Sequence, residues 1–116
     1  MSDVDNLSGL EFEDYVSGLL SAQGYVVRLT PINDFGVDVI ALRDNIRTAV
    51  QTKRYSKPVG LRAVQEVCGG MVQHHCTRTM VVTSNYFTPK AKQLAKTNGC
   101  RLVDRDELAR WVSSYS

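Results

Sequence analysis

Three polar residues in the middle of the chain interrupt segments that otherwise have the composition of buried strands. Asp38 lies in Val37-Asp38-Val39-Ile40, where its neighbours are apolar. Gln51 and Lys53 lie two positions apart in the next apolar segment, and they share a face because side chains alternate along a strand. If the two segments pair as a hairpin, a carboxylate, an amide oxygen and an ammonium converge on one spot.

Such a set is what phosphodiester cleavage requires. A hard cation such as Mg²⁺ takes oxygen ligands, commonly one or two carboxylates together with water and substrate phosphate. The cation lowers the pKa of water and stabilises charge on phosphate oxygens, and a nearby ammonium adds to that stabilisation. The alternative is a structural Asp–Lys pair buried in a sheet. The three residues together, preceded by a loop containing Gly36, favour the functional interpretation.

The segment before these residues predicts an amphipathic helix that begins at Ser8. Glu11 follows three positions later, so the two residues fit a capping box. Phe12, Val16 and Leu19 continue at helical spacing. Gly24 is placed to end the helix.

The remaining pattern predicts an α/β fold with the order α-β-β-β-α-β-α-β-α. Asp44-Asn45 makes a tight turn between the second and third strands. Strands separated by helices need crossover connections, so a mixed, at least partly parallel central sheet flanked by helices is expected. The predicted strands are 25–30, 37–42, 48–53, 79–83 and 100–103; the later helices are 60–74, one from Thr88-Pro89 to Asn98-Gly99, and one capped by Asp104.

Length and composition fit one globular domain. The chain has 116 residues, 43% of them hydrophobic and 22% charged, values ordinary for a soluble protein. No apolar run approaches the roughly 20 residues that span a bilayer. The acidic N-terminus lacks an apolar signal region, so a cytoplasmic location is the default expectation. We expect residues 1–7 to be a short flexible tail and residues 8–116 to form the domain.

The net charge is only +2, but the charges are segregated along the chain. Residues 1–14 carry acids and no Lys or Arg, whereas residues 43–62 carry six basic residues and one acid. A further basic group, Lys90, Lys92 and Lys96, lies on one predicted helix. Charge alone is explained by a solvated surface, but a basic stretch beside the polar set suits a polyanionic partner.

The cysteines and histidines do not suggest a metal or disulfide framework. Cys68, Cys76 and Cys100 are an odd number without paired spacing, so buried free thiols are expected. His74-His75 precedes Cys76, but adjacent helical residues point in different directions and no second ligand pair exists. A helix end explains these residues better than zinc.

Five segments in this order resemble the Mrr-type restriction endonuclease domain of the PD-(D/E)xK nuclease superfamily, over roughly residues 8–112. Each motif is short, but their order and spacing together are specific. The segments are Gly9-Leu10-Glu11-Phe12-Glu13, Gly24-Tyr25-Val26-Val27, Asp34-Phe35-Gly36-Val37-Asp38, Gln51-Thr52-Lys53-Arg54-Tyr55 and Val82-Thr83-Ser84-Asn85-Tyr86-Phe87-Thr88-Pro89-Lys90-Ala91.

The resemblance implies a mixed sheet flanked by helices and Mg²⁺-dependent DNA cleavage, with Mn²⁺ as a possible substitute. Asp38 matches the metal-binding aspartate, Gln51 the glutamate-or-glutamine position, and Lys53 the catalytic lysine. Glu13 matches an acidic residue of the first helix that helps to hold metal in related nucleases. Because an amide oxygen is a poorer ligand than a carboxylate, we expect modest metal affinity unless Glu13 or a DNA phosphate completes the site.

The expected partner is DNA, and the expected activity is that of an endonuclease. Arg54, Lys57 and Arg62 follow the predicted catalytic strand and are expected to contact phosphates near the cut. Two alternatives remain open: a Holliday-junction-type structure-specific resolvase, since such relatives act as dimers of chains this size, and an inactive nuclease-like module that only binds DNA. A homodimer is therefore possible, whereas neither a membrane nor a nucleotide cofactor is expected.

Overall fold

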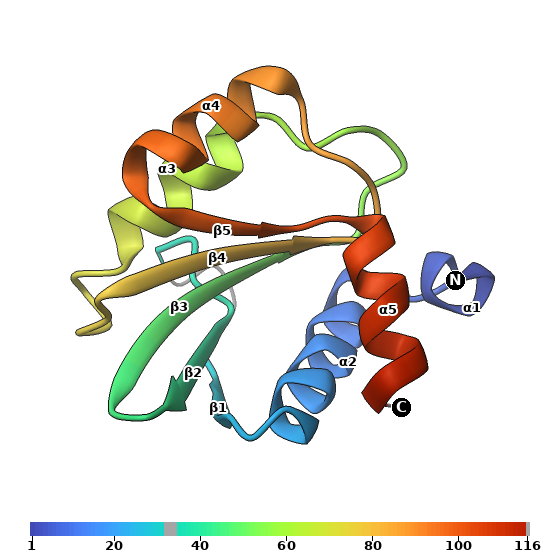
Figure 1. The fold of residues 1–116 in the computed structure, drawn as a ribbon, viewed down its shortest axis with the longest axis horizontal. Coiled ribbons are helices and arrows are strands. Elements are labelled where there is room, and N and C mark those ends of the chain that lie inside the picture. Colours follow the sequence, from blue (N-terminus) through green and yellow to red (C-terminus); the bar gives the residue numbers. More distant parts are fainter. Residues whose placement is uncertain (32–34, 116) are drawn as a thin grey trace.

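The structure, a computed structural model, describes residues 1–31 and 35–115. Helices cover both faces of a five-stranded sheet, with α3 and α4 on one face and α2 and α5 on the other (Figure 1). The elements are α1 (Ser2–Asp5), α2 (Gly9–Ala22), β1 (Val26–Leu29), β2 (Val39–Arg43), β3 (Ile46–Lys53), α3 (Leu61–Gly70), β4 (Arg78–Thr83), α4 (Pro89–Asn98), β5 (Cys100–Val103) and α5 (Arg105–Tyr115).

The predicted α/β class and element order are confirmed, with one short helix added at the N-terminus. We expected residues 1–7 to be a flexible tail, but they contain α1, and Val4 is only 3% exposed. Asp5 at the end of α1 pairs with Arg105 of α5 at 2.7 Å. The burial of Val4 and the ion pair of Asp5 therefore help to attach this segment to the rest of the fold.

The sheet is mixed, in the strand order β1-β2-β3-β4-β5. The first three strands pair antiparallel, and β4 and β5 add in parallel through the crossovers that contain α3 and α4. Asp44 and Asn45 both have positive φ, 54° and 64°, and close the β2–β3 hairpin. Aspartate and asparagine tolerate this conformation better than most residues, which explains why the sequence predicted the turn.

The capping box predicted for α2 is confirmed. The Glu11 backbone N–H donates to the Ser8 hydroxyl at 3.1 Å, and the Ser8 N–H donates to the Glu11 carboxylate at 2.8 Å. After the helix, Gly24 has φ +95°, a value that favours glycine and turns the chain into β1. Glu11 is thereby committed to the start of α2.

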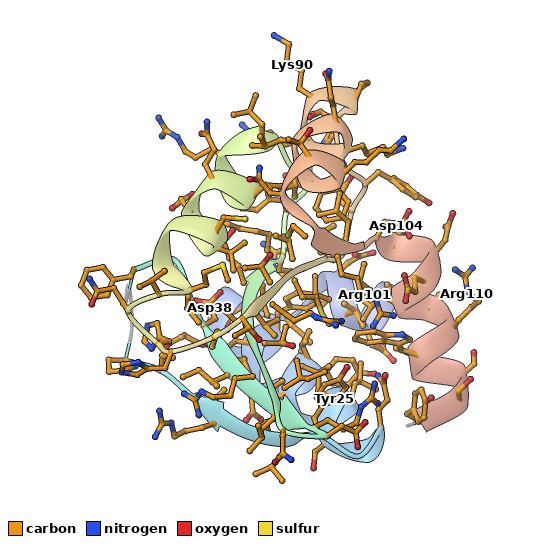
Figure 2. All side chains as sticks on the ribbon, turned by 60° about the vertical axis from the view of Figure 1, so that its left-hand side comes forward. Tyr25, Asp38, Lys90, Arg101, Asp104 and Arg110 are labelled. Carbon is orange, nitrogen blue, oxygen red and sulfur yellow. The ribbon has the colours of Figure 1, made fainter. Side chains whose placement is uncertain are left out.

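The sheet separates two apolar cores, and β3 contributes alternate residues to each. Val50 packs on the α2 and α5 side with Phe12 and Leu108, whereas Ala49 packs on the α3 and α4 side with Val64. Side chains fill the space between sheet and helices on both faces (Figure 2). The alternation means that Gln51 and Lys53 follow Ala49 toward α3, and Thr52 follows Val50 toward α2.

The thiols and histidines take structural positions. The three cysteines are free, Cys76 and Cys100 are buried, and burial raises the pKa of the Cys100 thiol to about 11. His74 and His75 lie in the turns after α3, where their carbonyls accept hydrogen bonds from Arg47. None of the helices in residues 1–31 and 35–115 is long and apolar enough to cross a lipid bilayer.

Candidate active site

A β-bulge redirects the chain at Asp38. The Asp38 backbone N–H donates to the Val50 carbonyl at 2.8 Å, although Val50 is already paired with Val39 in the strand register. Asp38 and Val39 on one strand thus lie opposite the single residue Val50 on the other, which is the arrangement of a β-bulge. Val37 and Ile40 lie in the same apolar core although regular alternation would separate them. Bulges of this kind re-aim a side chain, here the one aspartate of this apolar stretch.

The Asp38 carboxylate lies where β2 and β3 diverge. Its Oδ2 accepts the backbone N–H of Thr52 at 2.8 Å and the Thr52 hydroxyl at 3.2 Å. The strand pairing of β2 with β3 stops at Val39–Val50, so the carboxylate takes an N–H that the ladder no longer satisfies. Because Thr52 separates Gln51 from Lys53, Asp38 is fixed beside the backbone of the predicted catalytic strand.

The Gln51 side chain is buried, and only one end of its amide is paired. Its Nε2 donates to the Gly36 carbonyl at 3.0 Å, and the residue is 2% exposed. Its Oε1 is buried and finds no hydrogen-bond partner within the described ranges. An unpaired buried polar atom costs about 1–3 kcal/mol, so it needs an explanation.

Glu13 of α2 brings a second carboxylate toward Asp38. Burial raises the pKa of the half-buried Glu13 carboxyl, and the nearby charges of Asp38 and, to a smaller extent, Asp14 raise it further. A carboxyl group whose pKa is raised by burial and by a second, nearby carboxylate is a common feature of cation-binding sites. Glu11, the competitor for this role, is occupied by the capping box.

These oxygens fit a hard divalent cation. Two carboxylates, from Asp38 and Glu13, and one buried amide oxygen, from Gln51, belong to the ligand class that Mg²⁺ prefers. The part of the chain described here holds no cluster of three or more His, Cys, Asp or Glu residues suited to a metal. Any oxygen set formed here would therefore combine the two carboxylates with the amide oxygen of Gln51.

Lys53 faces the α3 side of the sheet. Its Nζ lies 5.4 Å from the centre of the Tyr55 ring, and it lines a small hollow with Arg62 and Glu66 of α3. Among the described residues it forms no ion pair with Asp38. The four predicted residues approach this end of the sheet from different directions. Asp38 lies between the diverging strands and approaches Glu13, while Gln51 and Lys53 turn toward α3.

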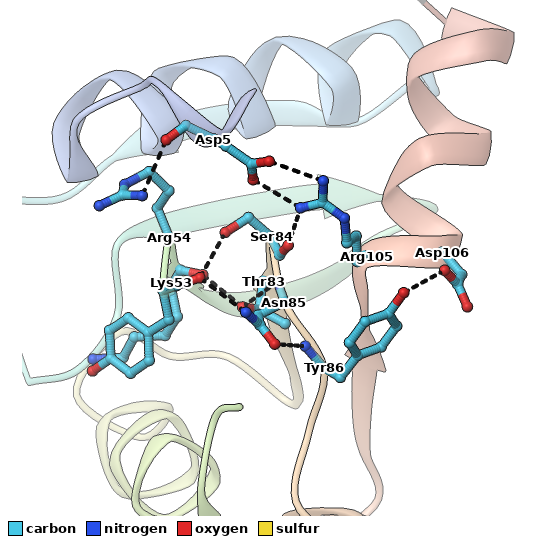
Figure 3. Close-up of polar contacts among 10 residues, drawn as sticks. Asp5, Lys53, Arg54, Thr83, Ser84, Asn85, Tyr86, Arg105 and Asp106 are labelled. Carbon is cyan, nitrogen blue, oxygen red and sulfur yellow. Dashed lines mark hydrogen bonds and ion pairs between the residues drawn. The ribbon is translucent and has the colours of Figure 1, made fainter. Parts of the chain in front are cut away.

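The backbone around Lys53 is held by the segment that follows β4. The Thr83 hydroxyl donates to the Lys53 carbonyl at 2.7 Å, and the Ser84 N–H donates to the same carbonyl at 3.2 Å (Figure 3). The Asn85 side-chain amide donates to the Tyr55 carbonyl at 3.3 Å. The sequence is compatible with either phosphate contact or turn chemistry for residues 83–85, and these bonds give them a role in holding the strand end.

The three residues predicted to bind DNA have different surroundings. Lys57 and Arg62 are exposed, and Arg62 lines the hollow beside Lys53. Arg54 is instead half-buried, and its Nη1 donates to the Asp5 backbone carbonyl at 3.2 Å (Figure 3). The Asp5 carboxylate in turn accepts hydrogen bonds from both terminal nitrogens of Arg105, at 2.7 and 2.9 Å.

Sequence reasoning missed the residues that position the site. Thr52 is only the variable position of the sequence motif, and Gly36 is only one residue of a loop. The Asp5–Arg105 pair joins positions 100 apart, which no local pattern reveals. The loop aspartate at position 34, which belongs to the family-like segment before Asp38, lies outside the described residues.

Three solved structures are similar to this chain. DNA modification-dependent restriction endonuclease AspBHI matches with TM-score 0.73 and 21% identity, over 89% of this chain and 30% of that one. MspJI restriction endonuclease in complex with a 27-mer oligonucleotide matches with TM-score 0.66 and 19% identity, over 87% and 27%. AF1548, a protein of unknown function, matches with TM-score 0.71 and 22% identity, over 87% and 65%.

These likenesses establish the restriction-endonuclease fold, and this chain spans less than two thirds of each of the three longer chains. No curated protein sequence matches the chain. The model of the Mrr catalytic family, described as restriction endonuclease, matches residues 4–112. That match covers nearly the whole chain and includes the bulged aspartate, the buried glutamine and the lysine. The chain belongs to the Mrr-type restriction endonuclease family.

Proposed function

We propose that this domain is a Mg²⁺-dependent DNA endonuclease that hydrolyses phosphodiester bonds, with Mn²⁺ able to replace Mg²⁺. The observation that carries the proposal is the buried Gln51 Oε1, which lacks a partner in residues 1–31 and 35–115, next to the bulge that fixes Asp38. A cation held by Asp38, Gln51 and Glu13 would satisfy that oxygen and relieve the repulsion between the two carboxylates.

Each residue has a distinct task in this proposal. Asp38 is pre-oriented by Thr52, so a carboxylate oxygen is presented without further ordering. Burial and the nearby charge of Asp38 raise the pKa of the Glu13 carboxyl, and a cation between the two carboxylates would favour its ionised form. When bound, the divalent cation supplies a lowered water pKa and neutralises charge on the phosphate.

Lys53 is the residue that contacts the phosphate of the DNA in this proposal. Its ammonium lies beside the Tyr55 ring and lines a hollow with Arg62 and Glu66, so two cationic side chains and one carboxylate border the position that a phosphate would take. An ammonium there stabilises charge that develops on the phosphate oxygens as the bond breaks. Arg62 and Lys57 add contacts to phosphates, which hold the DNA backbone in place without reading the base sequence. The oligonucleotide complex of MspJI, which has this fold, supports DNA as the partner.

The test is plasmid relaxation by the purified chain in three solutions: Mg²⁺, excess EDTA, and EDTA followed by excess Mg²⁺. We expect nicked or linear product in the first and third solutions and none in the second. Supercoiled DNA that survives in all three, with folded protein confirmed by circular dichroism, would refute the proposal. Cleavage that persists in EDTA would leave a nuclease but refute its metal dependence.

A further inference from the structure

The Gln51 amide has two ends, and the loop before Asp38 determines which end is free. The Gly36 carbonyl accepts the Nε2 N–H of Gln51 at 3.0 Å, so the amide oxygen is turned the other way. We propose that the Gly36 carbonyl is a positioning group, held against α3 by Gly70, that aims Gln51 Oε1 at the cation. This inference rests on the proposed metal site and adds to it the residues that orient one ligand.

The loop and α3 pack backbone against backbone. A Cβ on Gly70 would lie 1.9 Å from the Phe35 carbonyl oxygen and 2.9 Å from Val37 Cγ2. A Cβ on Gly36 would lie 2.8 Å from Glu66 Cβ and 2.9 Å from the Glu66 carbonyl oxygen, and Gly36 also has φ +73°. No side chain larger than hydrogen fits at either position, so the place of the Gly36 carbonyl is set by α3.

The arrangement also explains why an amide suits this position. A glutamine accepts with Oε1 and donates with Nε2, so it can ligate a cation and bind the loop at once. An ionised glutamate has no donor, and one of its oxygens would face the Gly36 carbonyl oxygen. The glutamate-or-glutamine position of the motif thus lies, in this chain, beside a loop carbonyl that can only accept a hydrogen bond.

The neighbouring glycine of α3 offers a matched control. Gly69 is exposed, and a Cβ built on it meets nothing within 4 Å. Gly69→Ala therefore makes the same chemical change in the same helix without touching the loop. We expect Gly69→Ala to bind Mn²⁺ as the wild type does, and Gly70→Ala to lose about tenfold in Mn²⁺ affinity, measured by calorimetric titration of Mn²⁺ into the full chain.

A double-mutant cycle separates positioning from general damage. If Gly70 acts through the Gln51 amide, Gly70→Ala should lower Mn²⁺ affinity less than about twofold once Gln51→Ala has removed that amide. Equal losses in both backgrounds would overturn the inference while leaving the metal site in place. A wild type that binds no Mn²⁺ at millimolar concentration, either alone or with a DNA duplex, would instead overturn the proposed function.

A measurement on the wild type covers the case in which Gly70→Ala does not fold. The hydrogen bond predicts a through-bond NMR coupling between the Gln51 side-chain nitrogen and the Gly36 carbonyl carbon, and slow exchange of one Nε2 proton. Both signals should persist when Mg²⁺ is added, because the cation takes the other end of the amide. Loss of the coupling on metal binding, or its absence beforehand, would overturn the inference.

Discussion

Thr52 binds the carboxylate of Asp38 twice, through its backbone N–H at 2.8 Å and through its hydroxyl at 3.2 Å. The bond from the backbone comes from the peptide group that joins Gln51 to Thr52, so the predicted metal ligand is tied to the strand that carries the other two site residues. The bond from the hydroxyl is additional, and a substitution of the side chain can remove it while leaving the backbone bond in place.

Thr52→Val should therefore weaken the site without abolishing it. The substitution keeps the N–H bond to Asp38 and removes the hydroxyl bond, at a cost of about 0.5–1.5 kcal/mol in the free energy of unfolding. We expect cleavage to fall no more than about tenfold, and Thr52→Ser to retain most activity. Urea unfolding and single-turnover cleavage measure the two effects. A Thr52→Val protein with no detectable cleavage would show that the hydroxyl does more than orient Asp38.

The attachment of α1 predicts a pH dependence of stability. The hydrogen bond from Arg105, reinforced by its charge, lowers the pKa of the Asp5 carboxyl below its ordinary 3.8. A lowered pKa in the folded state adds stability that is present above 3.8 and is lost as pH falls through the folded value. Asp5→Asn should therefore unfold more readily than the wild type at neutral pH, with the difference shrinking under acid conditions.

Denaturant unfolding of wild type and Asp5→Asn, at neutral and at acid pH, tests this contribution. Asp3→Asn, on the same short helix, is the matched control and should follow the wild type at every pH. A difference between wild type and Asp5→Asn that is constant with pH would mean that the pair contributes through packing alone. The Arg54 contact with the Asp5 carbonyl should survive the substitution, since it uses the backbone.

The surroundings of the basic residues predict which of them bind DNA. Lys57 and Arg62 are exposed, and Arg62 lines the hollow beside Lys53. Replacing both with Ala should reduce the slope of log affinity against log salt concentration by about 0.9 for each phosphate that is no longer neutralised. Lys90 points outward from the start of α4 (Figure 2), and Lys92 and Lys96 are exposed on the same helix. Lys92→Ala with Lys96→Ala is therefore the control pair.

Fluorescence anisotropy with a duplex in EDTA, at several salt concentrations, gives these slopes. We expect the Lys57 and Arg62 double variant to weaken binding to all sequences alike, and the control pair to leave the slope unchanged. Arg54→Ala should change the slope least of the three predicted DNA-binding residues, because its guanidinium is half-buried and donates to Asp5. A slope that changes only in the control pair would move the binding face to α4.

Gln51→Glu should lower stability and raise metal affinity. Without metal, the new carboxylate cannot donate to the Gly36 carbonyl, so the free energy of unfolding should fall by about 1–3 kcal/mol. With Mg²⁺, the added negative charge should tighten binding and make it less dependent on DNA, and binding to the folded state should restore stability.

Thermal unfolding in EDTA and in Mg²⁺ measures both halves of this prediction. Gln65→Glu places the same change on an exposed position of α3 and is the control. The Mg²⁺-induced rise in melting temperature should be larger for Gln51→Glu than for wild type. An equal rise would mean that residue 51 is not a ligand.

Local signals in the sequence predicted most of the fold. The Ser8–Glu11 capping box, the Asp44-Asn45 turn and the alternation of β3 depend on neighbours within a few positions, and all three are confirmed. The helix α1 was missed because its contacts are made with residues far along the chain: Val4 packs in the core beneath α2 and α5, and Asp5 pairs with Arg105.

The same distinction explains the candidate site. The spacing of Gln51 and Lys53 predicted correctly that they share a face. The bulge at Asp38 could not be read from the sequence, because regular alternation was the only available guide and the bulge breaks it. The orientation of Arg54 toward Asp5 likewise depends on where α1 packs, which is a property of the whole fold.

The central claim is that Asp38 and Lys53 are the working residues of a metal-dependent nuclease. The most direct test is single-turnover plasmid cleavage in Mg²⁺ by wild type, Asp38→Asn, Lys53→Ala and the surface control Lys96→Ala, each confirmed as folded by circular dichroism. We predict wild-type rates for Lys96→Ala and rates lower by about 10²-fold or more for the other two variants. Cleavage at the wild-type rate by folded Asp38→Asn or Lys53→Ala would contradict the claim.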